Sequence, residues 1–347
     1  MKQKLKKEYF SKMILVTGGT GLVGAHLMYF LLQDGQEVRA THRKNSNLNA
    51  VLQVFGYYTS EAQNLFDKIE WVEADLNDIP ALTKAFQDVE QVYHSGAYVS
   101  FDPKNFSKLQ KSNIEGTANV VNLCLAFGVK KLCHVSSIAA IGKSESEPIH
   151  EEMLWNPDDD NNVYAISKYG AEMEVWRGTQ EGLDAVVVNP GVIIGSGFWD
   201  KGTGVLFSKV YKGMNYYTTG EMGFVDVVDV VACMIELMKS DITNERFILV
   251  AESESYKNLL TKIAKAFGKK SPQKELKPWM LLLAANLDAF KSFILGTKQM
   301  LFKSTAKAMV TKRRYNNEKI KIALNYNFKS LDETVNEIVT NFKKDKP

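Results

Sequence analysis

The chain has 347 residues, of which 45% are hydrophobic and 24% charged, as is typical of a globular protein with one large or two smaller domains. Its 43 basic and 40 acidic residues leave a net charge of +3, so charge alone does not indicate a nucleic acid partner or an anionic membrane. Cys124, Cys133 and Cys233 have neither disulfide-framework nor metal-ligand spacing. We expect buried free thiols, a reducing cytoplasmic location and no metal site.

The first twelve residues are basic and are not followed by a long apolar segment with a small-residue cleavage site. We therefore expect residues 1–12 to be a disordered tail, or an extension upstream of a true start at Met13, and export is not predicted. The longest conspicuous apolar run, Trp279 to Ala285, is too short to span a bilayer, so no transmembrane segment is expected.

Short apolar runs alternate with segments of helical periodicity through most of the chain. The apolar runs are 13–17, 38–41, 69–74, 91–95, 131–136, 185–189 and 246–251, and the main helical segments between them are 22–33, 105–127 and 162–180. This alternation predicts an α/β fold with a doubly wound parallel sheet buried on both faces. We assign residues 13–191, with 225–252 returning, to a dinucleotide-binding core. Residues 192–224 and 253–342 are assigned to a smaller, mainly helical substrate lobe.

A glycine-rich segment, Thr17-Gly-Gly-Thr-Gly-Leu-Val-Gly24, follows the first predicted strand and opens the first predicted helix. Gly18, Gly21 and Gly24 permit a tight turn and bring backbone N–H groups close to a pyrophosphate at the helix N-terminus. In this context we interpret the segment as a phosphate-binding loop, the alternative being a purely structural turn.

The second predicted strand ends in Val38-Arg-Ala-Thr-His-Arg-Lys44, without the carboxylate that usually holds the ribose of NAD. Arg43 and Lys44, with Arg39 and His42 as further candidates, are suited to the 2′-phosphate of NADP. The missing acid favours NADP(H) as cofactor and leaves NAD(H) possible, while the alternative is a solvated basic loop. Asp75 follows the third strand, where it contacts the adenine or caps a turn.

Two Tyr-x-x-x-Lys segments occur, Tyr164 to Lys168 and Tyr315 to Lys319. This spacing puts both side chains on one face of any helix, so spacing alone does not identify a catalytic pair. The surrounding motifs must therefore separate them.

The motifs occur in an order that resembles the extended short-chain dehydrogenase/reductase family, and within it the branch of dihydroflavonol reductases and 3β-hydroxysteroid dehydrogenases. They are the glycine loop, His94-Ser-Gly-Ala97, Asn113-Ile-Glu-Gly-Thr117, Val135-Ser-Ser137, Tyr164-Ala-Ile-Ser-Lys168, Asn189-Pro-Gly191 and Phe224-Val-Asp226. The resemblance covers Met13 to about Thr334 and implies a Rossmann-type sheet.

The resemblance implies that Ser137, Tyr164 and Lys168 form a catalytic triad. A phenol of ordinary pKa near 10 is a slow base at neutral pH, so we expect the Lys168 ammonium to favour the phenolate of Tyr164. Ser137 then hydrogen-bonds the substrate oxygen. Ser137 stands five residues before Gly142, as in the family pattern, which leaves Ser136 structural. Asn113 either supports a water relay or bonds a backbone carbonyl.

The same resemblance implies a set of cofactor contacts, with His94 packed nearby rather than acting as a proton donor. The expected contacts are Gly18, Thr20, Gly21, Leu22, Val23, Gly24, Arg43, Lys44, Asp75, Leu76, Ser95, Gly96, Ala97, Tyr164, Lys168, Pro190 and Val192.

The predicted substrate lobe is rich in aromatic residues and has no arginine from Gly178 to Glu245. A sugar-nucleotide substrate requires cationic side chains that clamp its diphosphate, and arginine is well suited to that role. The absence of arginine and the many aromatic side chains therefore favour an apolar pocket. The substrate candidates are Val99, Phe101, Phe198, Tyr211 and Phe224.

We therefore expect an NADP-dependent oxidoreductase acting on the carbonyl or alcohol group of a hydrophobic small molecule. The alternatives are a nucleotide-sugar epimerase or dehydratase with tightly bound cofactor, and a non-catalytic cofactor sensor. The apolar segment 278–295 is expected to cover the substrate pocket, the alternative being a helix on a membrane surface. The helices at 105–127 and 162–180 are compatible with a monomer or a homodimer.

Overall fold

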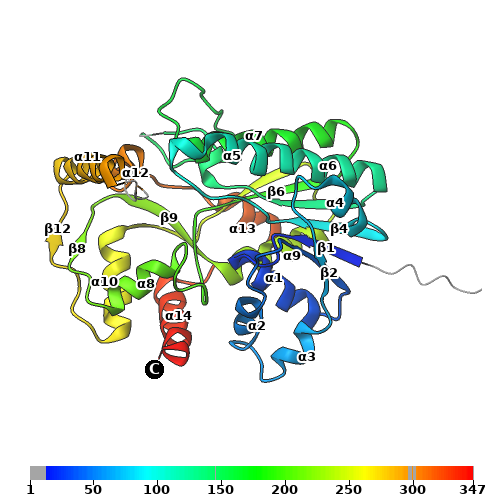
Figure 1. Ribbon diagram of the computed structural model, residues 1–347, viewed down its shortest axis with the longest axis horizontal. Coiled ribbons are helices and arrows are strands. Elements are labelled where there is room, and N and C mark those ends of the chain that lie inside the picture. The colour runs from blue at the N-terminus through cyan, green and yellow to red at the C-terminus, as the bar shows by residue number, and fades with distance from the viewer. Residues whose placement is uncertain (1–12, 145, 296–298, 300–301, 347) are drawn as a thin grey trace, which may run out of the picture.

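A seven-stranded sheet, parallel at every pairing, crosses the middle of the molecule in a computed structural model that describes residues 13–144, 146–295, 299 and 302–346 (Figure 1). In sheet order its strands are β10 (Glu245–Leu249), β6 (Ala185–Pro190), β5 (Lys131–Val135), β4 (Val89–His94), β1 (Met13–Thr17), β2 (Val38–His42) and β3 (Glu70–Glu73). All seven predicted strands are present. The expected basic tail, residues 1–12, lies outside the described residues.

Helices cover both faces of this sheet, and each face has its own apolar core. One face carries α1 (Leu22–Gln33), α2 (Asn49–Phe55), α3 (Ala62–Phe66), α9 (Val227–Lys239) and α13 (Glu318–Leu324). The other carries α4 (Ile79–Ala85), α6 (Gly116–Phe127) and α7 (Val163–Gln180). Strands buried on both sides have no polar face, which is why they appear as continuous apolar runs in the sequence. The predicted Rossmann-type fold is confirmed.

The second part of the molecule is a mixed lobe at the carboxyl edge of the sheet (Figure 1). Its strands are β7 (Val192–Ile194), β9 (Glu221–Asp226) and β11 (Glu252–Ser255) in one small sheet, and β8 (Tyr216–Tyr217) and β12 (Lys274–Glu275) in another. Its helices are α8 (Gly204–Tyr211), α10 (Tyr256–Phe267), α11 (Pro278–Leu295), α12 (Lys303–Ala308) and α14 (Leu331–Asp345). Buried side chains of α8, α10 and α14 form its core.

Helix α13 departs from the expected division of the chain. The sequence placed residues 253–342 in the lobe, but Ile320 of α13 is completely buried in the core beside α1 and α9, and α13 packs against β10. The chain therefore returns to the nucleotide-binding core once more before α14 begins.

The helix expected over residues 105–127 is not a continuous α-helix. It consists of a short turn η1 (Pro103–Asn105), α5 (Phe106–Leu109), a π-helical segment η2 (Gln110–Glu115) and then α6. The buried Asn113 lies in the π-helical segment. Its side-chain amide bonds both the N–H and the carbonyl of Tyr98, at 2.7 and 2.9 Å, which ties this irregular turn to the chain after β4. Such segments are frequent near functional sites.

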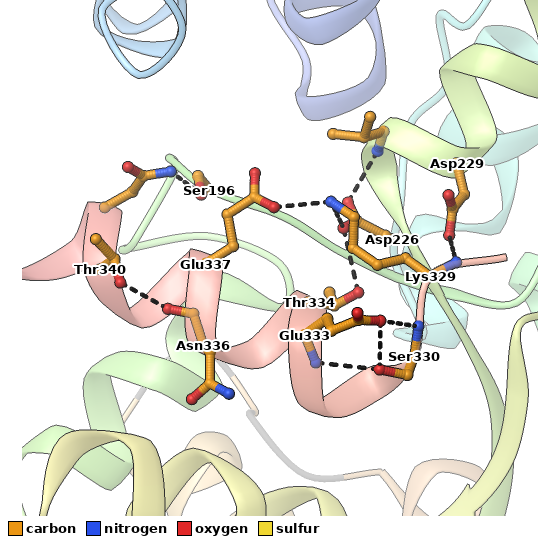
Figure 2. Close-up of polar contacts among 12 residues, drawn as sticks. Ser196, Asp226, Asp229, Lys329, Ser330, Glu333, Thr334, Asn336, Glu337 and Thr340 are labelled. Atoms are coloured by element: carbon orange, nitrogen blue, oxygen red, sulfur yellow. Dashed lines mark hydrogen bonds and ion pairs between the residues drawn. The ribbon is translucent and has the colours of Figure 1, made fainter.

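Polar contacts attach α14 to the end of β9 (Figure 2). Ser330 and Glu333 form a capping box that starts the helix. The Asp226 carboxylate caps α9 at Val228 N–H and also accepts from Thr334 and Lys329, each at 3.2 Å. Asp226, part of one of the sequence motifs, thus joins three elements.

Candidate active site

A cavity of about 990 Å³ lies at the carboxyl ends of β1 and β4. These strands are neighbours in the sheet, but the chain proceeds outward from them in opposite directions, and such switch points are where open α/β sheets bind ligands. Predicted cofactor residues that line the cavity are Gly18, Thr20, Gly21, Leu22, Arg43, Lys44, Asp75, Leu76, Ser95, Gly96 and Ala97.

The glycine loop has the backbone geometry that the sequence required of it. Gly18 has a φ of +73°, and a Cβ there would lie 2.6 Å from the Gly96 backbone. A Cβ on Gly24 would lie 2.4 Å from the Gly18 carbonyl oxygen, so Gly24 serves the packing of the loop, and Val23 packs on the adjacent core. Gly21 starts α1 without a side-chain cap, which leaves the helix N-terminus open to the cavity. These features fit a dinucleotide pyrophosphate.

The cavity wall after β2 is basic. His42, Arg43 and Lys44 line it. Arg39 does not, because its guanidinium is buried in an ion pair with Glu70 at 2.8 Å, and it also donates to main-chain carbonyls. The suggestion that Arg39 contacts a 2′-phosphate is therefore wrong.

Asp75 has the turn role considered for it, and its contact with the adenine stays a prediction. Its carboxylate accepts from the Asn77 N–H at 3.0 Å, which shapes the turn after β3, and it also lines the cavity. Thr20, on the glycine loop, reaches Ser46 at 3.3 Å and so connects this loop to the one after β2.

Two segments far away in the sequence complete the cavity, and sequence analysis missed most of them. The first is 197–204, where Phe198 has the unusual positive φ of 54°. The second is the C-terminus, where Asp345 and Lys346 line the cavity. The glycine spacing of Gly195, Gly197, Gly202 and Gly204 was a usable signal for a closely packed loop, whereas nothing local marked the C-terminus.

Ser137 and Tyr164 are brought together at the carboxyl end of β5. Ser137 caps a short turn, η3 (Ile138–Ala140), by accepting from Ala139 N–H at 3.1 Å. Tyr164 lies near Ser137. Tyr164 lies in the first turn of α7, which Asn162 caps.

Lys168 lies one turn after Tyr164 on α7 and is 2% exposed. Its Nζ donates to the Val135 carbonyl at 2.9 Å. Burial lowers the pKa of Lys168 to about 8, and the nearby Glu172 carboxylate opposes this change. Burial raises the pKa of Tyr164, while the hydrogen bond from Ser137 lowers it. The expected effect of the Lys168 ammonium on the Tyr164 phenolate stays a prediction.

Glu172, which sequence analysis did not select, is completely buried one further turn along α7. It accepts from Ser136 at 2.6 Å and from Asn189 at 2.8 Å, and pairs with Arg246 at 3.0 Å. Asn189 in turn donates to the Ser137 carbonyl. Glu172 therefore fixes the strand end that carries Ser137, and Ser136 has the structural role that was expected. Its position four residues after Lys168 was the available signal.

Asn113 and His94 are both buried near this site. The Asn113 amide bonds Tyr98 as described and donates to Ser167 at 3.0 Å. His94 lies between Thr17 and Thr117, at 2.6 and 3.0 Å, and burial lowers its pKa to about 3. A neutral, hydrogen-bonded His94 agrees with the expected packing role.

The proposed substrate residues fall into two groups. Phe101 stacks edge-on against Tyr164, with ring centroids 5.4 Å apart, and Val99 is exposed near it in the same loop. Phe198 lines the cavity. Tyr211 instead packs against Phe267 and Phe342 in the lobe core, and Phe224 is completely buried against Tyr256.

Pro190 and Val192 lie at the junction of the two parts and are not among the residues that line the cavity. Pro190 ends β6 beside Leu249 of β10, whereas Val192 starts β7 beside Phe224 of the small sheet.

The second Tyr-x-x-x-Lys segment does not form a helical pair. Tyr315 precedes α13, where it bridges to Ile149, and its hydroxyl points to Met222 Sδ at 3.6 Å. Lys319 lies on α13 and pairs with Glu245. The identical spacing therefore gives two unrelated environments.

The fold and glycine loop define a dinucleotide-binding α/β protein, in which Ser137 lies at the end of β5 and Tyr164 and Lys168 lie on α7. The chain belongs to the NAD-dependent epimerase/dehydratase family, which its residues 14–249 match. It is an NAD(P)-dependent enzyme of the short-chain dehydrogenase/reductase type, as the sequence predicted, and the relatives below support an oxidoreductase at the family level.

Similar proteins include reductases and an epimerase. The chain is 32% identical over 279 residues to a putative dihydroflavonol 4-reductase of Synechocystis, covering 78% of this chain and 77% of the relative. It is 27% identical to sterol demethylase protein B of Methylococcus capsulatus, covering 77% and 78%. UDP-glucose 4-epimerase of Thermotoga maritima has the same fold, with a TM-score of 0.76, 21% identity and coverage of 96% and 100%.

Proposed function

We propose that this enzyme uses NADP(H) to reduce, reversibly, a ketone or aldehyde group of a hydrophobic small molecule. The observation that carries the proposal is the grouping of Ser137, at the end of β5, with Tyr164 and the buried Lys168, which lie one turn apart on α7 and are tied to β5 by the bond from Lys168 Nζ to the Val135 carbonyl. A nicotinamide cofactor supplies the hydride when bound, and the chain's own residues manage the proton.

Each residue of the cluster has a distinct task. Ser137 Oγ, held by Ala139 N–H, hydrogen-bonds the substrate oxygen and orients it. Tyr164 Oη gives its proton to that oxygen during reduction and takes it back during oxidation. The charged Lys168 Nζ stabilises the phenolate that forms once the proton has left.

The preference for NADP rests on the charge of the cavity wall after β2. Arg43 and Lys44 line the cavity, and the segment from Val38 to Lys44 has no carboxylate. A 2′-phosphate placed there gains charge-assisted hydrogen bonds that NAD lacks.

The apolar character of the substrate rests on the surroundings of Tyr164. Phe101 covers one edge of the phenol ring. The names of the relatives, a dihydroflavonol reductase and a sterol demethylase protein, are compatible with ring-containing apolar substrates.

The proposal is tested by following NADPH oxidation with aromatic and aliphatic ketones, aldehydes, ketosteroids and long-chain 3-keto lipids, alongside nucleotide sugars. We expect net NADPH consumption with at least one apolar carbonyl class. Interconversion of nucleotide sugars without net NADPH consumption would support an epimerase and contradict the proposal.

A further inference from the structure

Helix α11 presents an apolar face to solvent. Trp279, Leu282, Leu283 and Leu287 are 62%, 43%, 50% and 59% exposed. At 100° per residue they fall within an arc of roughly 140°, while the buried Leu281 and Ala285 lie on the opposite side. The helix therefore has apolar side chains on both its inner and its outer face.

Another helix of the same lobe shows the usual arrangement. α10 buries Leu259, Leu260 and Ile263 and leaves Lys257 and Lys265 exposed. The face of α11 is not covered by the rest of the described chain, and α11 lies at the margin of the lobe, away from the central sheet (Figure 1). An exposed apolar patch of this kind marks an interaction surface.

The surroundings of α11 are strongly basic. Residues 269–314 contain eleven lysines and arginines but only two acidic residues, in a chain whose total charge is +3. Lys274 and Lys277 are exposed just before the helix, and Lys291 is exposed on it. The Lys274 ammonium lies 5.9 Å from the ring centre of Tyr216, which is itself 46% exposed. Aromatic and leucine side chains are thus accompanied by lysines.

We propose that this α11 surface, made of Trp279, Leu282, Leu283, Leu287 and Tyr216 with Lys274, Lys277 and Lys291, binds the headgroup region of an anionic lipid bilayer. Apolar side chains enter the boundary between headgroups and acyl chains, with Trp and Tyr at the interface, and the lysines contact lipid phosphates. No described helix is long and apolar enough to cross a bilayer, so the attachment is peripheral.

The charge pattern selects a bilayer over a second copy of the chain. A two-fold contact through α11 would bring together two surfaces that are both positively charged, and like charges at an interface oppose association. An anionic lipid surface supplies the complementary charge. The inference does not depend on the proposed reaction, because α11 residues do not line the cofactor cavity.

The test is flotation of the full chain with vesicles of phosphatidylcholine alone and of phosphatidylcholine with about one third phosphatidylglycerol. We expect binding to the anionic vesicles. The double variant Leu282→Gln/Leu283→Gln should weaken it by roughly 10-fold for each leucine. Lys274→Glu/Lys277→Glu should weaken it by at least about 20-fold, since each lysine near the surface contributes about fivefold.

Ile322→Gln and Leu154→Gln are matched controls, because these side chains are 80% and 87% exposed on other parts of the molecule. Both should bind vesicles like the parent chain. Unchanged NADPH binding, measured by fluorescence, verifies that each variant is folded.

Three results would overturn the proposal. They are binding to neither vesicle type, an equal loss of binding in the controls, and self-association of the parent chain in sedimentation experiments that only the leucine variant abolishes. The last result would assign the surface to a second copy.

Discussion

The charge of Lys168 changes with pH just above neutrality. Because burial lowers its pKa to about 8, the ammonium is present below that pH and is lost as the pH rises through it. We predict that kcat/KM for carbonyl reduction falls above about pH 8, and that Lys168→Arg, which keeps its charge, moves this limb to higher pH even if the rate is lower. If kcat/KM of the Lys168→Arg variant fell over the same pH range as that of the parent, another group would be responsible for the fall.

Arg43 and Lys44 are predicted to select the cofactor. Replacing both by serine should raise KM for NADPH by about 10- to 100-fold, because hydrogen bonds to a charged group are worth roughly 1.5–3 kcal/mol, and should leave KM for NADH nearly unchanged. Lys104→Ser, outside the cavity lining, is the control. An equal rise with both cofactors would mean that these residues shape the loop instead of binding a phosphate.

For single residues, sequence analysis identified site residues whose interaction partners are close in the chain and site residues that follow the end of a strand. The spacing of Tyr164 and Lys168 placed both on one helix face. The role of Glu172 depends on Arg246, 74 residues away, and Arg39 is occupied by Glu70 on the neighbouring strand. The packing of α7 on the sheet brings the first pair together and the pairing of β2 with β3 the second, and no local pattern contains that information.

Among the loops and helices, the phosphate loop makes the sharpest prediction. Gly18 and Gly35 both have positive φ, at +73° and +74°, but only at Gly18 would a Cβ meet other atoms, since nothing lies within 4 Å of one at Gly35. Gly35→Ala should therefore cost about 1 kcal/mol of unfolding free energy for its backbone conformation alone.

Gly18→Ala should cost clearly more than this and should also weaken NADPH binding, as measured by urea unfolding and fluorescence titration. Equal losses of stability, with NADPH binding intact in both variants, would show that the close approach of Gly18 to Gly96 is unimportant.

The strands were predicted more accurately than the helix before the active site. A parallel strand buried on both sides is defined by its own apolar residues, so the expected and observed bounds differ by at most two residues. In the π-helical segment at 110–115, Asn113 bonds the main chain of Tyr98, 15 residues earlier. The helical periodicity of the sequence alone predicted a regular helix there.

Over the whole molecule, Asp345 at the end of α14 joins three distant segments. Its carboxylate accepts hydrogen bonds from Tyr57, near α2, and from Trp199 Nε1 at 2.6 Å. Trp199 and Asp345 both line the cofactor cavity. We predict that Asp345→Ala reduces the unfolding free energy by about 1–3 kcal/mol, through two lost hydrogen bonds, and accelerates NADPH release several-fold in stopped-flow fluorescence.

Asp332→Ala on the same helix is the control, because its carboxylate is exposed and pairs with Lys262 inside the lobe. If both variants released NADPH at the parent rate, the C-terminus would have no part in retaining the cofactor.

The overall architecture could be predicted from the alternation of strands and helices, but the contacts between segments far apart in the sequence could not. Tyr57 and Asp345 are 288 residues apart, and α13 returns to the central core after a long excursion through the lobe. Such contacts depend on how completed elements pack, so they appear only in the folded structure.

The central claim is that Tyr164 transfers the proton. Tyr164→Phe removes only the hydroxyl, so NADPH should still bind with near-parental affinity while turnover falls by about 10²- to 10⁴-fold. Tyr315→Phe, from the segment with identical spacing, should change neither. Single-turnover measurement of NADPH oxidation with both variants tests this directly, and near-normal oxidation by Tyr164→Phe would contradict the account.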